Sequence, residues 1–585
     1  MRSAVAWQSG SMLAMPIPFT RSTGWRAISI AATLLASLSL TGAQAPVPSY
    51  DVLIAGGRVV DGTGAPWFRG DVALTGDRIV AIGDLRGRPA RVRVDATGLI
   101  VAPGFIDMLG QSEFNVLVDG RAASKITQGV TTEITGEGVS IAPVNDRMIQ
   151  AAKPGWDHFG VVQDFTTLAG YFTRLETRSK PAINIGTFVG LGGVRDFVIG
   201  RDNKPATAAD LEQMKKLVAD AMEQGALGLS SSLQYVPDRY ASVDETVELA
   251  RVARRYGGVY LTHQRSESGA IFESMDEAFQ VAERAQIPTE IWHLKTAYKA
   301  NWGRMPDVLK RIEAARARGL DVSANQYPYT RASNDLDSCL PLWVREGTDE
   351  QMIARLKDPS LRERIKKEMD DPNVTGWENQ WYGSGGADGV MVASVLNKDL
   401  RKYEGMTLTQ VGQAMGKDAR DALMDLVIAD QGQTACIISI MTEDDVRTAL
   451  KHPLVSIDTD SGAKAEDGRL SESRSHPRAW GTFARILGKY VREEKLLTLE
   501  EAVRKMTSRP AARVGLLDRG ILRPGMAADI TVFDPMTIRD VSTFEDPNHY
   551  SVGVKHVFVN GRAVVTDGRI TTERPGRPLR GPGYR

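Results

Sequence analysis

The feature that most constrains the fold is a strand–helix–strand unit in which both strands end in a histidine. Residues 257–265 and 289–295 each contain a short apolar run, which ends at His263 in the first and at His293 in the second. Residues 271–284 between them have the apolar spacing of an amphipathic helix. In a parallel βαβ unit both strands end at the same edge of the sheet, where such folds place their chemistry. We therefore expect the two imidazoles to lie together.

Composition narrows the classes of protein to consider. The 585-residue chain is 42% hydrophobic, which is enough for a large core and more than one domain. Its formal net charge is zero, so no nucleic-acid partner is expected, and no basic run indicates a membrane surface. Cys339 and Cys436 form no CxxC pair. We expect two buried free thiols, with a single disulfide as the alternative.

The amino terminus has the pattern of a secretory signal peptide. Arginines precede a short apolar run at residues 27–40, and Ala43-Gln44-Ala45 forms an A-x-A cleavage site. The run is short for a transmembrane span, so a membrane anchor is the less favoured alternative. We expect residues 1–45 to be removed and the mature protein to be exported, to the periplasm or outside the cell, without a membrane partner.

Short strands near both ends of the chain predict one small β domain. Apolar runs broken by glycine fill residues 50–101 and recur at residues 520–562, where Asn560-Gly561 is a hairpin signal. Neither segment is large enough to be stable alone. We therefore expect a β-sandwich built from residues 46–103 and 515–575. Residues 576–585 are expected to form a loose tail.

Between these β segments, strands and helices alternate. A helix is expected at residues 207–224, with Thr207 and Asp210 as its capping start. The alternation predicts an α/β fold with an eight-unit (β/α)8 barrel of the TIM type over residues 104–514. The interval of about 340–446 exceeds one βα unit and predicts an inserted subdomain over the barrel mouth, where the strands end.

Three metal-ligand types are expected at that mouth. His263, His293 and Asp460 each end a predicted barrel strand. Two imidazoles and a carboxylate suit a catalytic zinc ion with an open position for water. A lone histidine is more often a structural residue, but two at equivalent positions favour the metal. Four other histidines are expected to be structural or exposed: His158, His452, His549 and His556.

Several motifs occur together over residues 50–575. They are Ala-Pro-Gly-Phe-Ile-Asp at 102–107, Gln-Gly-Val-Thr-Thr at 128–132, Gly-Ala-Leu-Gly-Leu-Ser at 225–230, Leu-Thr-His-Gln-Arg at 261–265, Asn-Trp-Gly-Arg at 301–304, Tyr-Pro-Tyr at 327–329, His-Pro-Arg at 476–478 and Arg-Pro-Gly-Met-Ala-Ala-Asp at 523–529. In these the chain resembles the amidohydrolase superfamily, and within it the N-acyl-D-amino-acid deacylases. The resemblance implies a metal-dependent barrel with a β-sandwich that hydrolyses the amide bond of an N-acylated amino acid.

The chain departs from this family at its metal-binding positions. Members carry His-x-His after the Phe-Ile-Asp stretch, where this chain has Leu109 and Gln111. Neither side chain replaces an imidazole as a zinc ligand, so the metal site that the pair would build is expected to be absent. The family's cysteine ligand matches Glu137, within Gly-Glu-Gly at 136–138. A carboxylate is a competent, harder zinc ligand.

The resemblance therefore implies one zinc ion per chain, held by Glu137, His263 and His293 with a water. Glu133 is the alternative carboxylate. Asp460 matches the family's general base, which takes a proton from the attacking water and passes it to the leaving nitrogen. Spacing alone does not separate Asp460 from Asp458, and the motif favours Asp460.

Four further residues match or lie near family positions that bind substrate. Arg265 and Arg478 are suited to hold the substrate carboxylate bidentately. Their alternative role is ion pairing within the protein. Ser333 and Tyr240 lie near positions that assist.

We expect an enzyme whose partner is a small-molecule amide, an N-acyl-D-amino acid or a similar N-capped compound. Two alternatives remain open. The same fold can act on D-dipeptides, cyclic amides or amide-linked natural products. Because His-x-His is missing, the barrel can also be a degenerate one that binds acylated ligands without turnover. The sequence does not indicate an oligomeric state.

Overall fold

A closed ring of parallel strands forms the centre of the fold. The computed structural model describes residues 49–374, 376–472 and 474–585, and these contain eight strand positions of the ring. In order they are β6 (Phe105–Asp107), β7 (Val130–Thr135), the interrupted strand β8 (Asn184–Thr187) and β9 (Val189–Gly190), β10 (Gly228–Ser232), β11 (Val259–His263), β12 (Thr289–Ile291), β13 (Val322–Gln326) and β17 (Val455–Ile457). A parallel bridge between Gly110 and Ser461 joins the last strand to the first. The predicted (β/α)8 barrel is confirmed.

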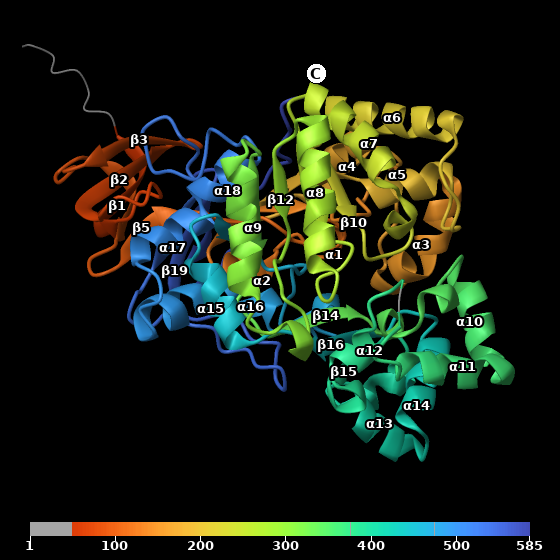
Figure 1. Cartoon of the computed structure of the whole chain (residues 1–585). Helices are drawn as coiled ribbons and strands as arrows, with labels where there is room; N and C mark the ends of the chain where they lie inside the picture. Colours follow the sequence, from red (N-terminus) through yellow and green to blue (C-terminus); the bar gives the residue numbers. More distant parts are fainter. Residues whose placement is uncertain (1–48, 375, 473) are drawn as a thin grey trace, which may run out of the picture. The chain divides into compact units, whose positions relative to one another are not determined.

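Amphipathic helices cover the outside of this ring, among them α6 (Ala208–Glu223), α7 (Val243–Arg255), α8 (Ile271–Ala285) and α9 (Met305–Ala317) (Figure 1). The predicted capping box of α6 is present, with Thr207 and Asp210 each bonded to the other's backbone. Met275 and Phe279 of α8 pack with Ile291 of β12 in one apolar cluster. Every residue of β11 is buried, as expected for a parallel strand covered on both faces.

Strands from both ends of the described chain form one sheet. In the residues that the structure covers it has nine strands. Eight follow one another in the order β21 (Arg569–Ile570), β20 (Arg562–Thr566), β19 (Val554–Val559), β18, β5, β1, β2 (Phe68–Thr75) and β3 (Arg78–Gly83), and β4 is also paired to β1. β18 (Ile530–Phe533) pairs antiparallel with β5 (Ile100–Pro103), so that red and blue strands adjoin in Figure 1. β4 (Ala90–Asp95) and β5 run parallel to β1 (Tyr50–Val59).

The inserted subdomain begins and ends earlier in the chain than predicted. Its sheet joins β14 (Arg331–Asp335) and β15 (Val390–Ser394) to the central strand β16 (Ala435–Ser439). Helices α10–α14, between 349 and 429, belong to it. α15 (Glu443–Lys451) instead packs on α9 and β17 as a barrel helix. The predicted start at 340 is wrong because β14 is polar and half-buried, unlike a barrel strand. As expected, Cys339 and Cys436 are free and buried.

The last residues are not the loose tail that we predicted. The backbone of Ile185 in β8 exchanges hydrogen bonds with Arg577 and Leu579, and Gly581 donates to the carbonyl of Gly225. Arg580 is paired with Glu176 at 2.7 Å. A stretch rich in Pro and Gly is thus ordered because the barrel offers it free backbone groups.

The predicted signal peptide, residues 1–45, lies outside the described residues. Within residues 49–374, 376–472 and 474–585, no helix is both long and apolar enough to cross a membrane.

Candidate metal centre

Three ligand types meet at the carboxyl ends of β7, β11 and β12. Oε1 of Glu137 lies 3.0 Å from Nδ1 of His263 and 3.4 Å from Nε2 of His293. One potential ligand atom from each residue lies within 4.8 Å of the other two. Within the chain that the structure covers, this is the one group of at least three such residues close enough to hold a metal ion. The three side chains that the sequence analysis named as ligands therefore lie together in the structure.

The Gly-Glu-Gly stretch explains how Glu137 reaches this position. Gly136 and Gly138 have φ values of +94° and +60°, which glycine adopts at little cost. A Cβ atom on Gly138 would lie 2.5 Å from the Cβ atom of Ser232. The turn after β7 therefore requires glycine on both sides of the carboxylate. His293, two residues after β12, also has a positive φ of 35°, a strained conformation that is common at functional sites.

The outward-facing nitrogen of each imidazole has its own partner. Nδ1 of His293 lies 3.0 Å from Oε1 of Glu267, and Nε2 of His263 lies 2.9 Å from Oε1 of Gln234. Lys295 binds the same Glu267 oxygen at 2.8 Å. Such partners fix the ring orientation and leave the other nitrogen free for a metal. The sequence analysis missed Gln234, Glu267 and Lys295, although Lys295 follows His293 at the two-residue spacing of a strand.

The electrostatics of the group favour a cation. Burial and Lys295 both lower the pKa of His293, yet the carboxylates of Glu267, Asp460 and Glu137 outweigh them and raise it to about 10. Burial would raise the pKa of Glu137, but hydrogen bonds from His263 and His293 hold it well below its usual range. Carboxylates therefore surround His293, and two imidazoles plus a carboxylate are a donor set that fits a divalent ion such as zinc.

Glu133 is not the metal-ligating carboxylate. Its oxygens accept hydrogen bonds from the backbone N–H and the hydroxyl of Ser112, at 2.9 and 2.8 Å. Nζ of Lys125 lies 3.5 Å away, and both side chains are fully buried. The Glu133 carboxylate is therefore already bound to groups inside the barrel.

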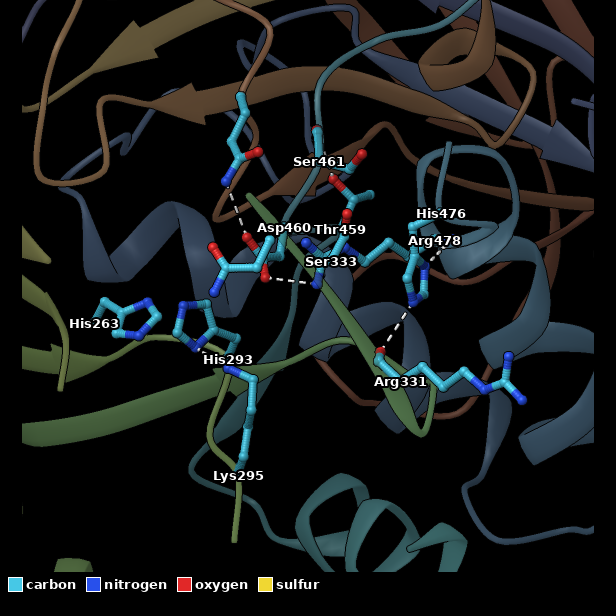
Figure 2. A network of polar contacts seen from close by, with 12 residues as sticks. His263, His293, Lys295, Arg331, Ser333, Thr459, Asp460, Ser461, His476 and Arg478 are labelled. Carbon is cyan, nitrogen blue, oxygen red and sulfur yellow. Dashed lines mark hydrogen bonds and ion pairs between the residues drawn. The ribbon is translucent and has the colours of Figure 1, made fainter. Parts of the chain in front are cut away.

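Asp460, and not Asp458, faces the metal centre. Asp460 follows β17 with a φ of 44° and lines the same cavity as the three ligand types. Its Oδ2 lies 2.7 Å from Nη1 of Arg478 (Figure 2). Asp458 is fully buried, and neither oxygen has a hydrogen-bond partner among the described residues. Burial and the nearby Asp460 raise the pKa of Asp458 well above its usual range, so it is a neutral acid inside the barrel.

His476 connects Arg478 to the inserted subdomain. Its Nε2–H donates to the carbonyl of Arg331 at 2.9 Å, while its Nδ1 accepts from the backbone N–H of Arg478 at 3.0 Å (Figure 2). Burial, together with the charge of Arg478, lowers the pKa of His476 well below its usual range. The ring is therefore neutral and locked in one tautomer.

The site opens into a cavity of about 280 Å³ between the barrel mouth and the inserted subdomain. Ser333 lines it and donates to the carbonyl of Cys436. Arg201 and Arg345 also line it, and Arg345 forms no ion pair within the part of the chain described here. Tyr240 does not line this cavity, and its buried hydroxyl has no partner among the described residues.

Neither arginine predicted to bind substrate lies in the cavity wall. Arg265 forms a bidentate ion pair with Glu277, at 2.8 and 2.7 Å, and donates to the carbonyls of Arg239 and Ala241. Arg478 is buried behind Asp460. The substrate-binding role does not fit these placements, because each guanidinium is already bound to a carboxylate of the protein.

Comparison with known proteins identifies the family. Residues 444–565 match the model of the Amidohydrolase family. The chain is 35% identical over 531 residues to an N-acyl-D-glutamate deacylase of Alcaligenes xylosoxydans xylosoxydans, covering 91% of this chain and 96% of that one. The crystal structure of N-acyl-D-glutamate deacylase from Bordetella bronchiseptica, with zinc and a phosphonate mimic of the tetrahedral intermediate, is 32% identical. It superimposes with a TM-score of 0.75 over 91% of this chain and all of that one.

A structure of D-aminoacylase is equally similar, with 33% identity and a TM-score of 0.75 over 91% of this chain and all of that one. That structure addresses the binuclear metal centre of D-aminoacylase, with activation by one metal and attenuation by the second. The barrel therefore belongs to a known architecture. The chain is a member of the D-aminoacylase family of metal-dependent amidohydrolases, enzymes that hydrolyse amide bonds.

Proposed function

We propose that this protein is an exported N-acyl-D-amino-acid deacylase with one zinc ion per chain. The observation that carries the proposal is the placement of Glu137, His263, His293 and Asp460 in one cavity. Support for the substrate class comes from the relatives, which include an N-acyl-D-glutamate deacylase and a D-aminoacylase. Export is supported only by the signal-peptide pattern of residues 1–45.

The residues divide the chemistry between them. Glu137, His263 and His293 hold the ion, which when bound supplies Lewis-acid activation of water and of the scissile carbonyl. The carboxylate of Asp460 accepts the proton of the attacking water and delivers it to the amide nitrogen as that nitrogen leaves. Arg478 fixes the orientation of that carboxylate through the 2.7 Å ion pair.

The substrate carboxylate needs a cation in the cavity wall. Lys295 lines the cavity but is bound to Glu267. Arg345 lines it without an ion pair in the described chain. Arg345 is therefore the residue best placed to hold the carboxylate of an N-acyl amino acid, by the bidentate geometry that guanidinium groups favour.

The test combines metal analysis with a substrate panel. Zinc per chain is measured on the purified mature protein, and hydrolysis is followed on N-acetyl-D- and N-acetyl-L-amino acids. We expect one zinc and turnover of D-substrates only. Glu137→Ala should lose both, whereas Glu212→Ala, which removes an exposed glutamate of α6, should keep both.

Two results would contradict the proposal in different ways. Bound zinc without hydrolysis of any member of the panel would reject the substrate class and direct the search to larger or cyclic amides. Absence of metal, with no activity on adding zinc, would leave a barrel that binds acylated ligands without turnover.

A further inference from the structure

The side-chain amide of Gln111 lies between the two carboxylates of the site. Its Nε2 is 3.1 Å from Oε2 of Glu137 and 3.1 Å from Oδ1 of Asp460. An ionised carboxylate only accepts hydrogen bonds, so only the NH₂ end of the amide fits here. Both of its protons are then used, one for the metal-ligating carboxylate and one for the general base.

The backbone of Gln111 is fixed at the closure point of the barrel. Its N–H donates to the carbonyl of Ser461 at 3.2 Å, and the N–H of Gly110 donates to the carbonyl of Ile134 at 2.8 Å. A Cβ atom on Gly462 would come within 2.6 Å of the Gln111 carbonyl oxygen. The close approach of the first and last strands therefore holds the amide over the site.

Neither Leu109 nor the inner carboxylates of Asp107 and Glu133 are available to a second ion beside this amide. The side chain of Leu109 is fully buried in an apolar cluster with Ile134, Leu261 and Trp292. Nζ of Lys125 lies 2.7 Å from Oδ2 of Asp107 and 3.5 Å from Oε2 of Glu133. Lys125 thus supplies the positive charge that balances these inner carboxylates.

We propose that Gln111 takes the place of a second cation: its amide bridges Glu137 and Asp460, limits the centre to one metal ion, and positions the general base. Two carboxylates that face one site repel each other unless a cation or a donor lies between them. The neutral NH₂ group meets this need without binding metal. The attenuation by a second metal that is described for D-aminoacylase then has no counterpart in this chain.

The metal half of the proposal is tested by titrating metal-free protein with zinc in a calorimeter. The wild-type protein should take up one equivalent even when zinc is in tenfold excess. Gln111→Glu, which replaces the donor by a third carboxylate of the same shape, should take up a second equivalent. Gln213→Glu adds the same charge at an exposed position of α6 and should take up one. Two equivalents in the wild-type protein, or one in Gln111→Glu, would overturn the inference.

The positioning half rests on the proposed function and is tested with Gln111→Met, which has similar length but no donor. We expect kcat to fall about 10- to 100-fold, because a misplaced catalytic group costs that much. KM should stay within about twofold and the melting temperature should not change. A kcat equal to that of the wild-type protein would exclude the positioning role.

The two halves can fail separately from the proposed function. If no N-acyl amino acid is hydrolysed, the calorimetric titration still measures how many ions the centre holds, and the comparison between Gln111→Glu and Gln213→Glu still decides the metal half.

Discussion

Asp460 and Arg478 form a buried ion pair, 2.7 Å long, in which Asp460 lines the cavity of the candidate metal centre and Arg478 lies behind it. Arg478 also packs against the ring of Tyr327, with its guanidinium carbon 4.6 Å from the ring centre. It is therefore held on both sides and presents its charge to Asp460 and not to the cavity. The family resemblance associated Arg478 with the substrate carboxylate. In this structure Arg478 instead orients Asp460, the proposed general base.

Replacing Asp460 by Asn should remove proton transfer while keeping the fold. We expect kcat/KM to fall by about 10²- to 10⁴-fold, the usual contribution of a general base, with zinc content unchanged. Asp458→Asn is the matched control, because Asp458 is a neutral acid and Asn has nearly the same shape. Steady-state kinetics of both variants decides the assignment, and equal losses would contradict it.

Arg345 and Arg265 should behave differently when each is replaced by Met. Arg345→Met should raise KM for N-acyl-D-amino acids about tenfold with kcat little changed, since uniform binding energy is lost. Arg265→Met leaves Glu277 without its partner, so we expect a lower melting temperature and no selective effect on KM. A KM effect confined to Arg265→Met would restore the role that the sequence predicted for Arg265.

Lys125→Met should destabilise the barrel strongly. The Lys125 ammonium is fully buried and bonded to Asp107, Thr459 and the carbonyl of Ser461 at 2.7 Å each. Removing one partner of a buried ion pair costs about 3–5 kcal/mol, because the remaining charge stays buried. Urea unfolding measures the loss. Lys153→Met, at an exposed helix position, should change the free energy of unfolding by less than about 0.5 kcal/mol.

His476 should make part of the stability depend on pH. Its pKa in the fold lies well below the ordinary value of 6.5, so below about pH 6.5 the unfolded chain takes up a proton that the folded chain does not. The contribution of His476 to stability therefore decreases as the pH falls.

The stability cost of His476→Gln, which keeps one donor and one acceptor, should be smaller at pH 5 than at pH 7.5 by about 2 kcal/mol. Unfolding curves of both proteins at the two pH values test this. A cost that is independent of pH would show that folding leaves the pKa of His476 unchanged.

Export predicts a defined mature amino terminus. If residues 1–45 are a signal peptide, the protein recovered from the periplasm or the medium should begin near Pro46. N-terminal sequencing checks this, and a chain that keeps its leader in the cytoplasm would contradict it.

The barrel and the positions of His263 and His293 could be predicted from local sequence patterns, whereas Glu137 was named only through the family resemblance. His263 closes a fully buried strand, and Glu137 is set by a turn that needs a glycine on each side. These features depend on neighbours in the chain.

The rest depended on tertiary packing. The packing of helices and loops decides that Arg265 pairs with Glu277 and that Arg478 pairs with Asp460. The sequence around each arginine does not indicate its partner. The same holds for Gln111, whose amide meets a carboxylate 349 positions away. Residues 576–585 are likewise held in place by hydrogen bonds to the backbone of β8. Their composition does not predict this contact.

The sheet that joins both ends of the described chain has a consequence for biosynthesis. β5 borders β18, which the ribosome makes more than 400 residues later. Until then the early strands have an unpaired edge, and such long-range pairing is slow. The β domain is therefore completed only after translation of the barrel, and a chain threaded across a membrane during synthesis would assemble this sheet on the far side.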